Sequence, residues 1–179
     1  AWDVMCHDLT PATVLGRSGE LYAAPRIDNL ASCHAALEAL REIDTVENNT
    51  IAVIVLFDHE EIGSESSTGA RGPMLANALE RLAGTRSATR EQFLRALNRS
   101  VCVSADGAHA VHPNYVDRHE PQHRVVLNGG PVIKTNANVR YATDAESNAL
   151  FQSVCRSAGV PFQQYAHRTN LLCGSTIGP

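Results

Sequence analysis

Residues 53–64 of the chain read VIVLFDHEEIGS, an apolar run followed directly by an acidic cluster. Its first half is a continuous apolar run rich in β-branched residues, which is typical of a strand buried on both faces. Its second half holds four consecutive ionisable residues, Asp58 to Glu61, and then Gly63. Buried carboxylates are costly unless something pairs with them, so this cluster indicates a bound cation. A solvated acidic loop is the alternative for the cluster taken alone.

Strand-like and helical patterns alternate along the rest of the chain. Short β-segments are expected within residues 1–24, and apolar runs predict further strands at residues 101–106, 131–135 and 161–166. Apolar residues at three- and four-residue steps predict amphipathic helices that follow Asp28, Pro73 and Asp144, with another around residues 93–97. This alternation predicts an α/β fold, a three-layer α/β/α sandwich around a largely parallel mixed sheet.

The composition is that of a soluble globular protein and narrows the classes of partner. The chain has 179 residues, of which 44% are apolar and 19% charged, with a formal net charge of −4 and no basic tract. These values argue against nucleic acid as a partner, and no apolar stretch reaches membrane-spanning length. The N-terminus lacks the order of a signal peptide, which favours the cytoplasm. Five widely spaced cysteines without a Cys-x-x-Cys pair are interpreted as small buried thiols in a reducing compartment.

Two histidine patterns suggest metal sites but fit them poorly. Residues 119–123 read HEPQH and match the His-Glu-x-x-His pattern of zinc proteases, which works only on a helix. Pro121 lies between the two histidines and disfavours that helix. His109 and His112 could share one face of a helical turn, although Pro113 argues against a long helix. Each of these two histidines could be an ordinary surface-loop residue or a hydrogen-bond donor at a functional site, and both interpretations stay open.

Four carboxylates make a more coherent set. They follow strand-like segments or precede the next helix, where open α/β sheets bind their ligands, and they are Asp28, Glu60, Glu61 and Asp106. Carboxylates that converge at one sheet edge can hold two zinc ions if histidines complete the coordination. For Asp28 alone, helix capping is the simpler interpretation.

The chain also carries an ordered series of longer segments. They are APRIDNL at 24–30, DHEEIGSES at 58–66, SADGAHAVHPNY at 104–115, GPVIK at 130–134, RYA at 140–142 and CGSTIGP at 173–179. With these segments the sequence closely resembles the aspartyl aminopeptidases, dinuclear zinc exopeptidases that remove acidic residues from peptide N-termini. The resemblance covers nearly the whole chain. One departure is Asn170-Leu171-Leu172, where the family usually has an aspartate and no Leu-Leu pair.

The resemblance implies a role for each matching position. Asp28 would bridge two zinc ions and be followed by a cis peptide bond, while Glu61 and Asp106 would each bind one ion. Glu60 would be the general base that activates water. The positions implied to bind substrate are His109, Lys134 and Tyr141.

The resemblance also implies an organisation and a set of partners. Residues 1–23 would be the tail of an inserted dimerisation domain, and residues 24–179 part of the catalytic domain, incomplete at both ends. The family's two histidine ligands would lie outside these residues. The expected protein is a cytoplasmic homo-oligomer that acts on peptides with N-terminal Asp or Glu and binds neither nucleic acid nor membrane. The alternatives are a non-catalytic scaffold piece and another dinuclear zinc hydrolase that acts on acylated amino acids.

Overall fold

The computed structural model of the protein describes residues 4–44, 50–168 and 171. The chain divides into two compact units, Ala1–Leu56 and Phe57–Pro179. In the first unit the elements are β1 (Thr13–Leu15), β2 (Leu21–Ala23) and α1 (Ile27–Arg41). In the second they are η1 (Glu60–Ile62), α2 (Met74–Thr85), α3 (Arg90–Asn98), η2 (Pro113–Arg118), β3 (Val132–Thr135), α4 (Ala145–Ser157) and β4 (Gln163–Ala166).

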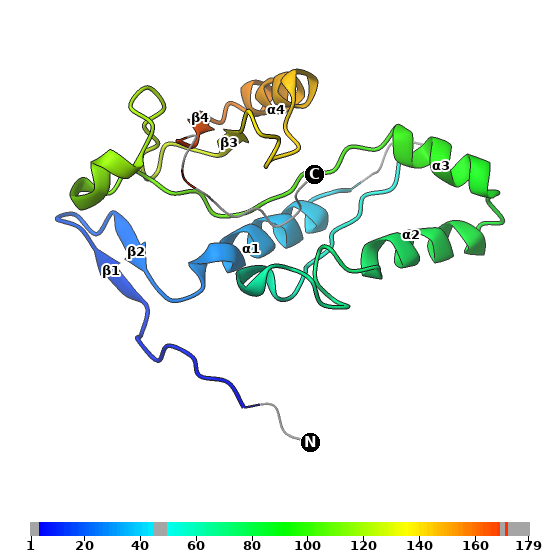
Figure 1. Cartoon of the computed structure of the whole chain (residues 1–179), viewed down its shortest axis with the longest axis horizontal. Coiled ribbons are helices and arrows are strands. Elements are labelled where there is room, and N and C mark those ends of the chain that lie inside the picture. Colours follow the sequence, from blue (N-terminus) through cyan, green and yellow to red (C-terminus); the bar gives the residue numbers. More distant parts are fainter. Residues whose placement is uncertain (1–3, 45–49, 169–170, 172–179) are drawn as a thin grey trace. The chain divides into compact units, whose positions relative to one another are not determined.

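The first unit begins with an antiparallel hairpin. Strands β1 and β2 pair with Val14 opposite Tyr22, and the loop between them turns at Gly16 and Gly19, both with positive φ. Figure 1 shows the two short strands side by side in blue. The predicted short β-segments in this region are confirmed.

Helix α1 follows the hairpin and starts irregularly. Asp28 and Asn29 have non-helical backbone dihedrals, and the cap residue Arg26 makes no side-chain capping bond. The predicted apolar stripe is present, but its leucines are largely exposed: Leu30 is 59% and Leu37 46% exposed. None of the described residues of α1 is buried.

The second unit is organised around a β-α-β motif. Strands β3 and β4 pair in parallel, with Val132 opposite Gln163 and Lys134 opposite Tyr165, and helix α4 connects them. Figure 1 shows this motif as adjacent short strands beside the orange helix. Asp144 caps α4 by accepting a hydrogen bond from the Ser147 backbone N–H, at 2.8 Å. The bonds from Ser147 hold the pKa of Asp144 below its ordinary value. The strands and helix predicted here are confirmed.

The core lies beside this motif. Val125, Tyr141 and Tyr165 form a buried cluster, and the partly buried Val132 packs against it. Ile133 and Cys155 are the other buried hydrophobic residues of the described chain. Among the residues that the structure describes, all five buried hydrophobic side chains therefore belong to the second unit.

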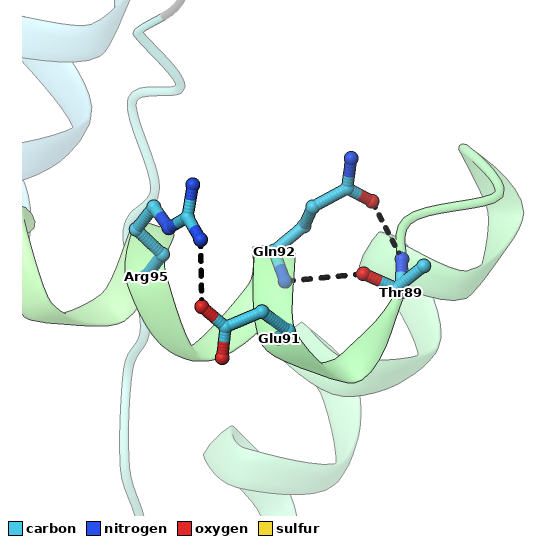
Figure 2. A network of polar contacts seen from close by, with 4 residues as sticks. All are labelled: Thr89, Glu91, Gln92 and Arg95. Atoms are coloured by element: carbon cyan, nitrogen blue, oxygen red, sulfur yellow. Dashed lines mark hydrogen bonds and ion pairs between the residues drawn. The ribbon is translucent and has the colours of Figure 1, made fainter.

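Helices α2 and α3 form where the sequence predicts them. Thr89 caps α3 in a reciprocal arrangement: the Gln92 backbone N–H donates to the threonine hydroxyl at 3.2 Å, and the Thr89 backbone N–H donates to the Gln92 side chain at 2.8 Å. Figure 2 shows this capping box with the Glu91–Arg95 ion pair one turn further on. Arg90 pairs with Glu80 and so links the start of α3 to α2.

Two predicted strands are absent from the described structure. Residues 51–57 and 101–106 are not strands, and Ile51 and Val101 are 71% and 65% exposed. An apolar run becomes a strand only when a neighbouring strand pairs with it, and within the described ranges the two sheets have two strands each.

The expectation of buried cysteines is wrong for most of those described. The four are free; Cys155 is buried, Cys33 is half-buried, and Cys6 and Cys102 are exposed. Cys102 lies in the run at 101–106. It is exposed because this run does not form the buried strand that its composition predicts. Cys173, with the segment 173–179, lies outside the described residues, as do Asn170 and Leu172.

No helix in the described part of the chain is both long enough and apolar enough to cross a membrane.

The capping box of α3 gives a direct test of local stability. Replacing Thr89 with alanine removes the acceptor for the Gln92 N–H, so the free energy of unfolding should fall by about 1 kcal/mol. Thr89→Ser keeps a hydroxyl in the same place and should recover most of the loss. Denaturant unfolding of the three proteins measures both effects. Equal losses in the two variants would show that the hydroxyl does not stabilise α3.

Candidate functional site

Glu60 and Glu61 lie in a tight turn that separates their side chains. The turn η1 is bounded by His59 and Gly63, which have left-handed φ values of 64° and 99°. The Gly63 N–H donates to the Glu60 carbonyl at 2.9 Å. Glu60 is half-buried whereas Glu61 is exposed. Gly63 therefore allows a sharp turn, and the two adjacent glutamates have different environments.

The loop after this turn folds back and holds it in place. The Asp58 N–H donates to the Thr68 carbonyl at 3.3 Å, and the Arg71 N–H donates to the Ser64 carbonyl at 3.1 Å. Ser64 is buried, and His59 Nδ1 shares a 2.6 Å hydrogen bond with the Ser66 hydroxyl. These contacts join both ends of the loop, so the position of Glu60 is fixed by backbone hydrogen bonds.

Asp106, Lys134 and Tyr141 come together in the second unit. The Lys134 ammonium lies 3.4 Å from an Asp106 carboxylate oxygen and donates to the Gly107 carbonyl at 2.5 Å. It also lies 5.7 Å from the centre of the Tyr141 ring, a cation–π contact. The lysine and aspartate side chains are only 12% and 13% exposed. Three residues predicted from distant segments thus form one largely buried cluster.

A cavity of about 270 Å³ opens beside this cluster. Its lining residues are Asp106, Ala108, Ala110, Val125, Val126, Leu127, Asn128, Gly130, Pro131, Val132 and Gln163. Residues 106, 108 and 110 alternate along the chain, as expected of an extended segment with one face toward the cavity. His109 is exposed and is not among the described residues that line it. Binding of substrate by His109 stays a prediction.

Sequence reasoning missed Gln163. Its side chain bonds the backbone of Val126 at both the N–H, at 2.9 Å, and the carbonyl, at 3.1 Å. A glutamine in a short strand carries no motif, and the partner is 37 residues away. The only signal in the sequence is a polar residue at a position where strands prefer β-branched and aromatic ones.

The two histidine patterns have structural roles. His112 caps η2 by accepting from the Asn114 N–H at 3.1 Å, and its ring contacts Tyr115. Residues 119–123 are not helical, so the zinc-protease geometry is absent, as the proline predicts. Instead His123 Nδ1 lies 2.6 Å from the Glu120 carboxylate. This hydrogen bond holds the pKa of Glu120 below its ordinary value of 4.5.

Asp28 belongs to the first unit, whereas Glu61 and Asp106 belong to the second. Its peptide bond to Asn29 is cis, as the resemblance implies. Carboxylate oxygens suit zinc, so the donor chemistry of Asp28, Glu61 and Asp106 fits the ion. Among the described residues no three histidine, cysteine or acidic side chains gather as a metal site. A centre made from these three carboxylates has to combine both units, and their convergence stays a prediction.

Comparison with known proteins decides the family. The sequence matches the family described as "Aminopeptidase I zinc metalloprotease (M18)" over residues 1–179. The chain belongs to this family. It is 50% identical to the "Probable M18 family aminopeptidase 2" of Mycobacterium tuberculosis over an alignment of 179 positions, which covers 97% of this chain and 41% of that protein. The chain therefore spans about two-fifths of this relative.

Solved structures of similar chains confirm the α/β fold. The "Cryo-EM structure of the Ape4 and Nbr1 complex" superposes with a TM-score of 0.83 at 38% identity, covering 94% of this chain and 33% of that one. The "Structure of S. cerevesiae mApe1 dodecamer" superposes with a TM-score of 0.77 at 29% identity, covering 89% of this chain and 37% of that one. The M18 chain thus has the fold class that its alternating pattern predicts.

The Glu120–His123 contact has a measurable pH signature. Its contribution is present while Glu120 is ionised, above the unfolded pKa, and is lost as pH falls through the depressed folded pKa. We expect His123→Ala to raise the pKa of Glu120 toward 4.5. His119→Ala removes the other histidine of the same pattern and should leave this pKa unchanged. An NMR titration of the Glu120 carboxyl measures it, and equal shifts in both variants would contradict the assignment.

Proposed function

We propose that this M18 chain is part of a zinc aminopeptidase that releases acidic residues from peptide N-termini. The observation that carries the proposal is the cluster of Asp106, Lys134 and Tyr141, which joins a predicted metal ligand to two predicted substrate-binding residues. A largely buried ammonium group beside a carboxylate and a small cavity suits recognition of a negatively charged side chain.

The proposed metal ligands are Asp28, Glu61 and Asp106, with two zinc ions in each active site. Histidines elsewhere in the full-length polypeptide would complete the coordination. When bound, zinc polarises the scissile carbonyl and lowers the pKa of water, which makes hydrolysis possible near neutral pH. Exposed Glu61 is the glutamate more accessible to an ion, and half-buried Glu60 is the one set back from solvent.

The remaining steps belong to side chains of the chain itself. Glu60 accepts the proton of the attacking water as general base, held by the turn around Gly63. Asp106 would help to hold zinc, and Lys134 would then present its charge to the carboxylate of a substrate side chain. The buried Tyr141 limits the room around the ammonium group, and exposed His109 donates a hydrogen bond to the substrate.

The organisation of the whole protein is part of the same proposal. Residues 1–23 form the end of an inserted dimerisation domain, and residues 24–179 belong to the catalytic domain. The full-length protein assembles into a homo-oligomer in the cytoplasm, with neither nucleic acid nor membrane as a partner. The solved relative that is a dodecamer supports the assembly, and the many exposed apolar side chains of this chain call for further packing surfaces.

The two glutamates can be separated by substitution in the full-length protein. Glu60→Gln keeps the side-chain shape but cannot accept the proton, so kcat should fall by about 10²- to 10⁴-fold with zinc content nearly intact. Glu61→Gln weakens a ligand and should lower zinc occupancy together with the rate. Zinc stoichiometry and kcat measured on both variants test the roles. If Glu60→Gln loses zinc while Glu61→Gln keeps both zinc and activity, the roles of the two glutamates are the reverse of those proposed.

Substrate choice tests Lys134. Lys134→Met removes the charge while keeping much of the length, so kcat/KM should fall by about tenfold or more for N-terminal Asp substrates, because hydrogen bonds to charged groups are the stronger ones. For N-terminal Ala substrates the loss should be much smaller. Lys134→Arg keeps a cation and should retain more of the preference. An unchanged ratio between the two substrates in Lys134→Met would show that this lysine does not select acidic residues.

A further inference from the structure

We propose that Gln163 is a positioning residue of the active site, acting through the wall of the cavity that Asp106 lines. The inference rests on the aminopeptidase function proposed above. Gln163 touches neither substrate nor metal in this role. It holds the backbone of residues 125–130, and that backbone holds the segment that carries Asp106.

The side chain of Gln163 takes the place of a strand partner. Its carboxamide accepts from the Val126 N–H at 2.9 Å and donates to the Val126 carbonyl at 3.1 Å. The same nitrogen lies 3.4 Å from the Gly130 carbonyl. One amide therefore satisfies both backbone groups of Val126, as a neighbouring strand would. The backbone N–H of Gln163 donates separately to the Pro131 carbonyl at 2.8 Å and keeps β4 in register.

The held segment connects directly to the site. Val125, next to Val126, is buried among the core tyrosines, and its carbonyl accepts from the Val111 N–H at 2.9 Å. Val111 ends the extended segment whose residues 106, 108 and 110 line the cavity. A continuous path of hydrogen bonds thus runs from β4 through Gln163 and residues 125–126 to the Asp106 segment.

Gly129 lies directly against the Gln163 side chain. A Cβ atom on Gly129 would lie 2.5 Å from the side-chain nitrogen, so a larger residue there would push the glutamine carboxamide aside. An alanine at 163 carries no carboxamide and cannot bond Val126. The contact between Gln163 and residues 126–130 therefore depends on the full glutamine side chain.

The neighbouring Gln164 provides a matched control. It lies on the same strand and is similarly half-buried, but its side chain bonds Asn148 of helix α4, at 3.3 and 3.4 Å. Successive residues of a strand point to opposite faces, so these two glutamines hold different structures. Truncation of either one removes side-chain hydrogen bonds made by β4. Those of Gln164 reach α4, whereas those of Gln163 reach Val126 and Gly130, which line the cavity.

The experiment compares Gln163→Ala and Gln164→Ala in the full-length zinc-loaded protein. We expect Gln163→Ala to lower kcat/KM by about tenfold, the loss that one well-made hydrogen bond is worth. Gln164→Ala should keep the wild-type kcat/KM, although it should lower thermal stability by about as much as Gln163→Ala does. Equal activity losses in the two variants would overturn the proposal, since the effect would then follow stability alone.

Gln163→Glu adds a readout that a merely structural role would not give. Its carboxylate can accept from the Val126 N–H but cannot donate to the Val126 carbonyl, whereas the protonated acid can do both. The ratio of its kcat/KM to the wild-type value should rise as pH falls, with the folded fraction verified at each pH. For Gln163→Ala the same ratio should stay flat. A flat ratio for Gln163→Glu would also count against the proposal.

Hydrogen exchange separates this inference from the proposed function. In Gln163→Ala the amides of Val126 and Val111 should exchange faster, and in Gln164→Ala they should not. If the full-length wild-type protein shows no peptidase activity, the proposed function fails, and the exchange of Val111 still decides whether Gln163 positions the Asp106 segment. If the wild type is active and Val111 exchange is unchanged in Gln163→Ala, the positioning role alone is wrong.

Discussion

The ion pair between Lys134 and Asp106 is the contact on which the candidate site depends. Both side chains are largely buried, and removing a charge from water costs several kcal/mol per ion unless a partner compensates it. Compensation comes from the opposite charge, from the Gly107 carbonyl and from the face of Tyr141. Because the pair joins strand β3 to a segment 28 residues earlier, the strand and the cavity wall have to form together. Lys134 is the only lysine among the 179 residues, so no neighbouring lysine can replace it.

The parts of the fold that the sequence predicts are those with local causes. Helix α4 follows from an apolar stripe between Asp144, which caps it, and Gly159, which ends it; both signals lie within a few residues of the helix. The runs at 51–57 and 101–106 show the limit of this reasoning. Their composition is that of buried strands, but a strand also needs a partner, and strand pairing is a long-range property that no local pattern encodes.

The candidate site likewise contains residues that the sequence predicts and residues that it does not. The carboxylates could be predicted because their residue types at strand ends carry chemistry, and Lys134 and Tyr141 because of the family resemblance. The structure brings Asp106, Lys134 and Tyr141 together, and their roles stay predictions. Gln163 could not be predicted, because its importance comes only from what it touches across the fold. The pattern at 119–123 fails for the opposite reason. Its residues match the zinc-protease pattern, but Pro121 disfavours the helix that would place both histidines on one face. What forms instead is an ordinary contact between Glu120 and His123.

The packing of the helices constrains where a rigid site can be built. Helices α1, α2 and α3 have no buried residue among those described, although each has apolar residues at helical spacing. Isolated helices of this length are marginal in water, and most of their stability in proteins comes from packing an apolar face. The β-α-β motif differs, because α4 buries Cys155, β3 carries the buried Ile133 and β4 carries the buried Tyr165. The Asp106–Lys134 cluster is attached to this better-packed part. A site that must hold charges in a fixed place is best built where backbone and core already restrict movement, and β3 and β4 meet that requirement.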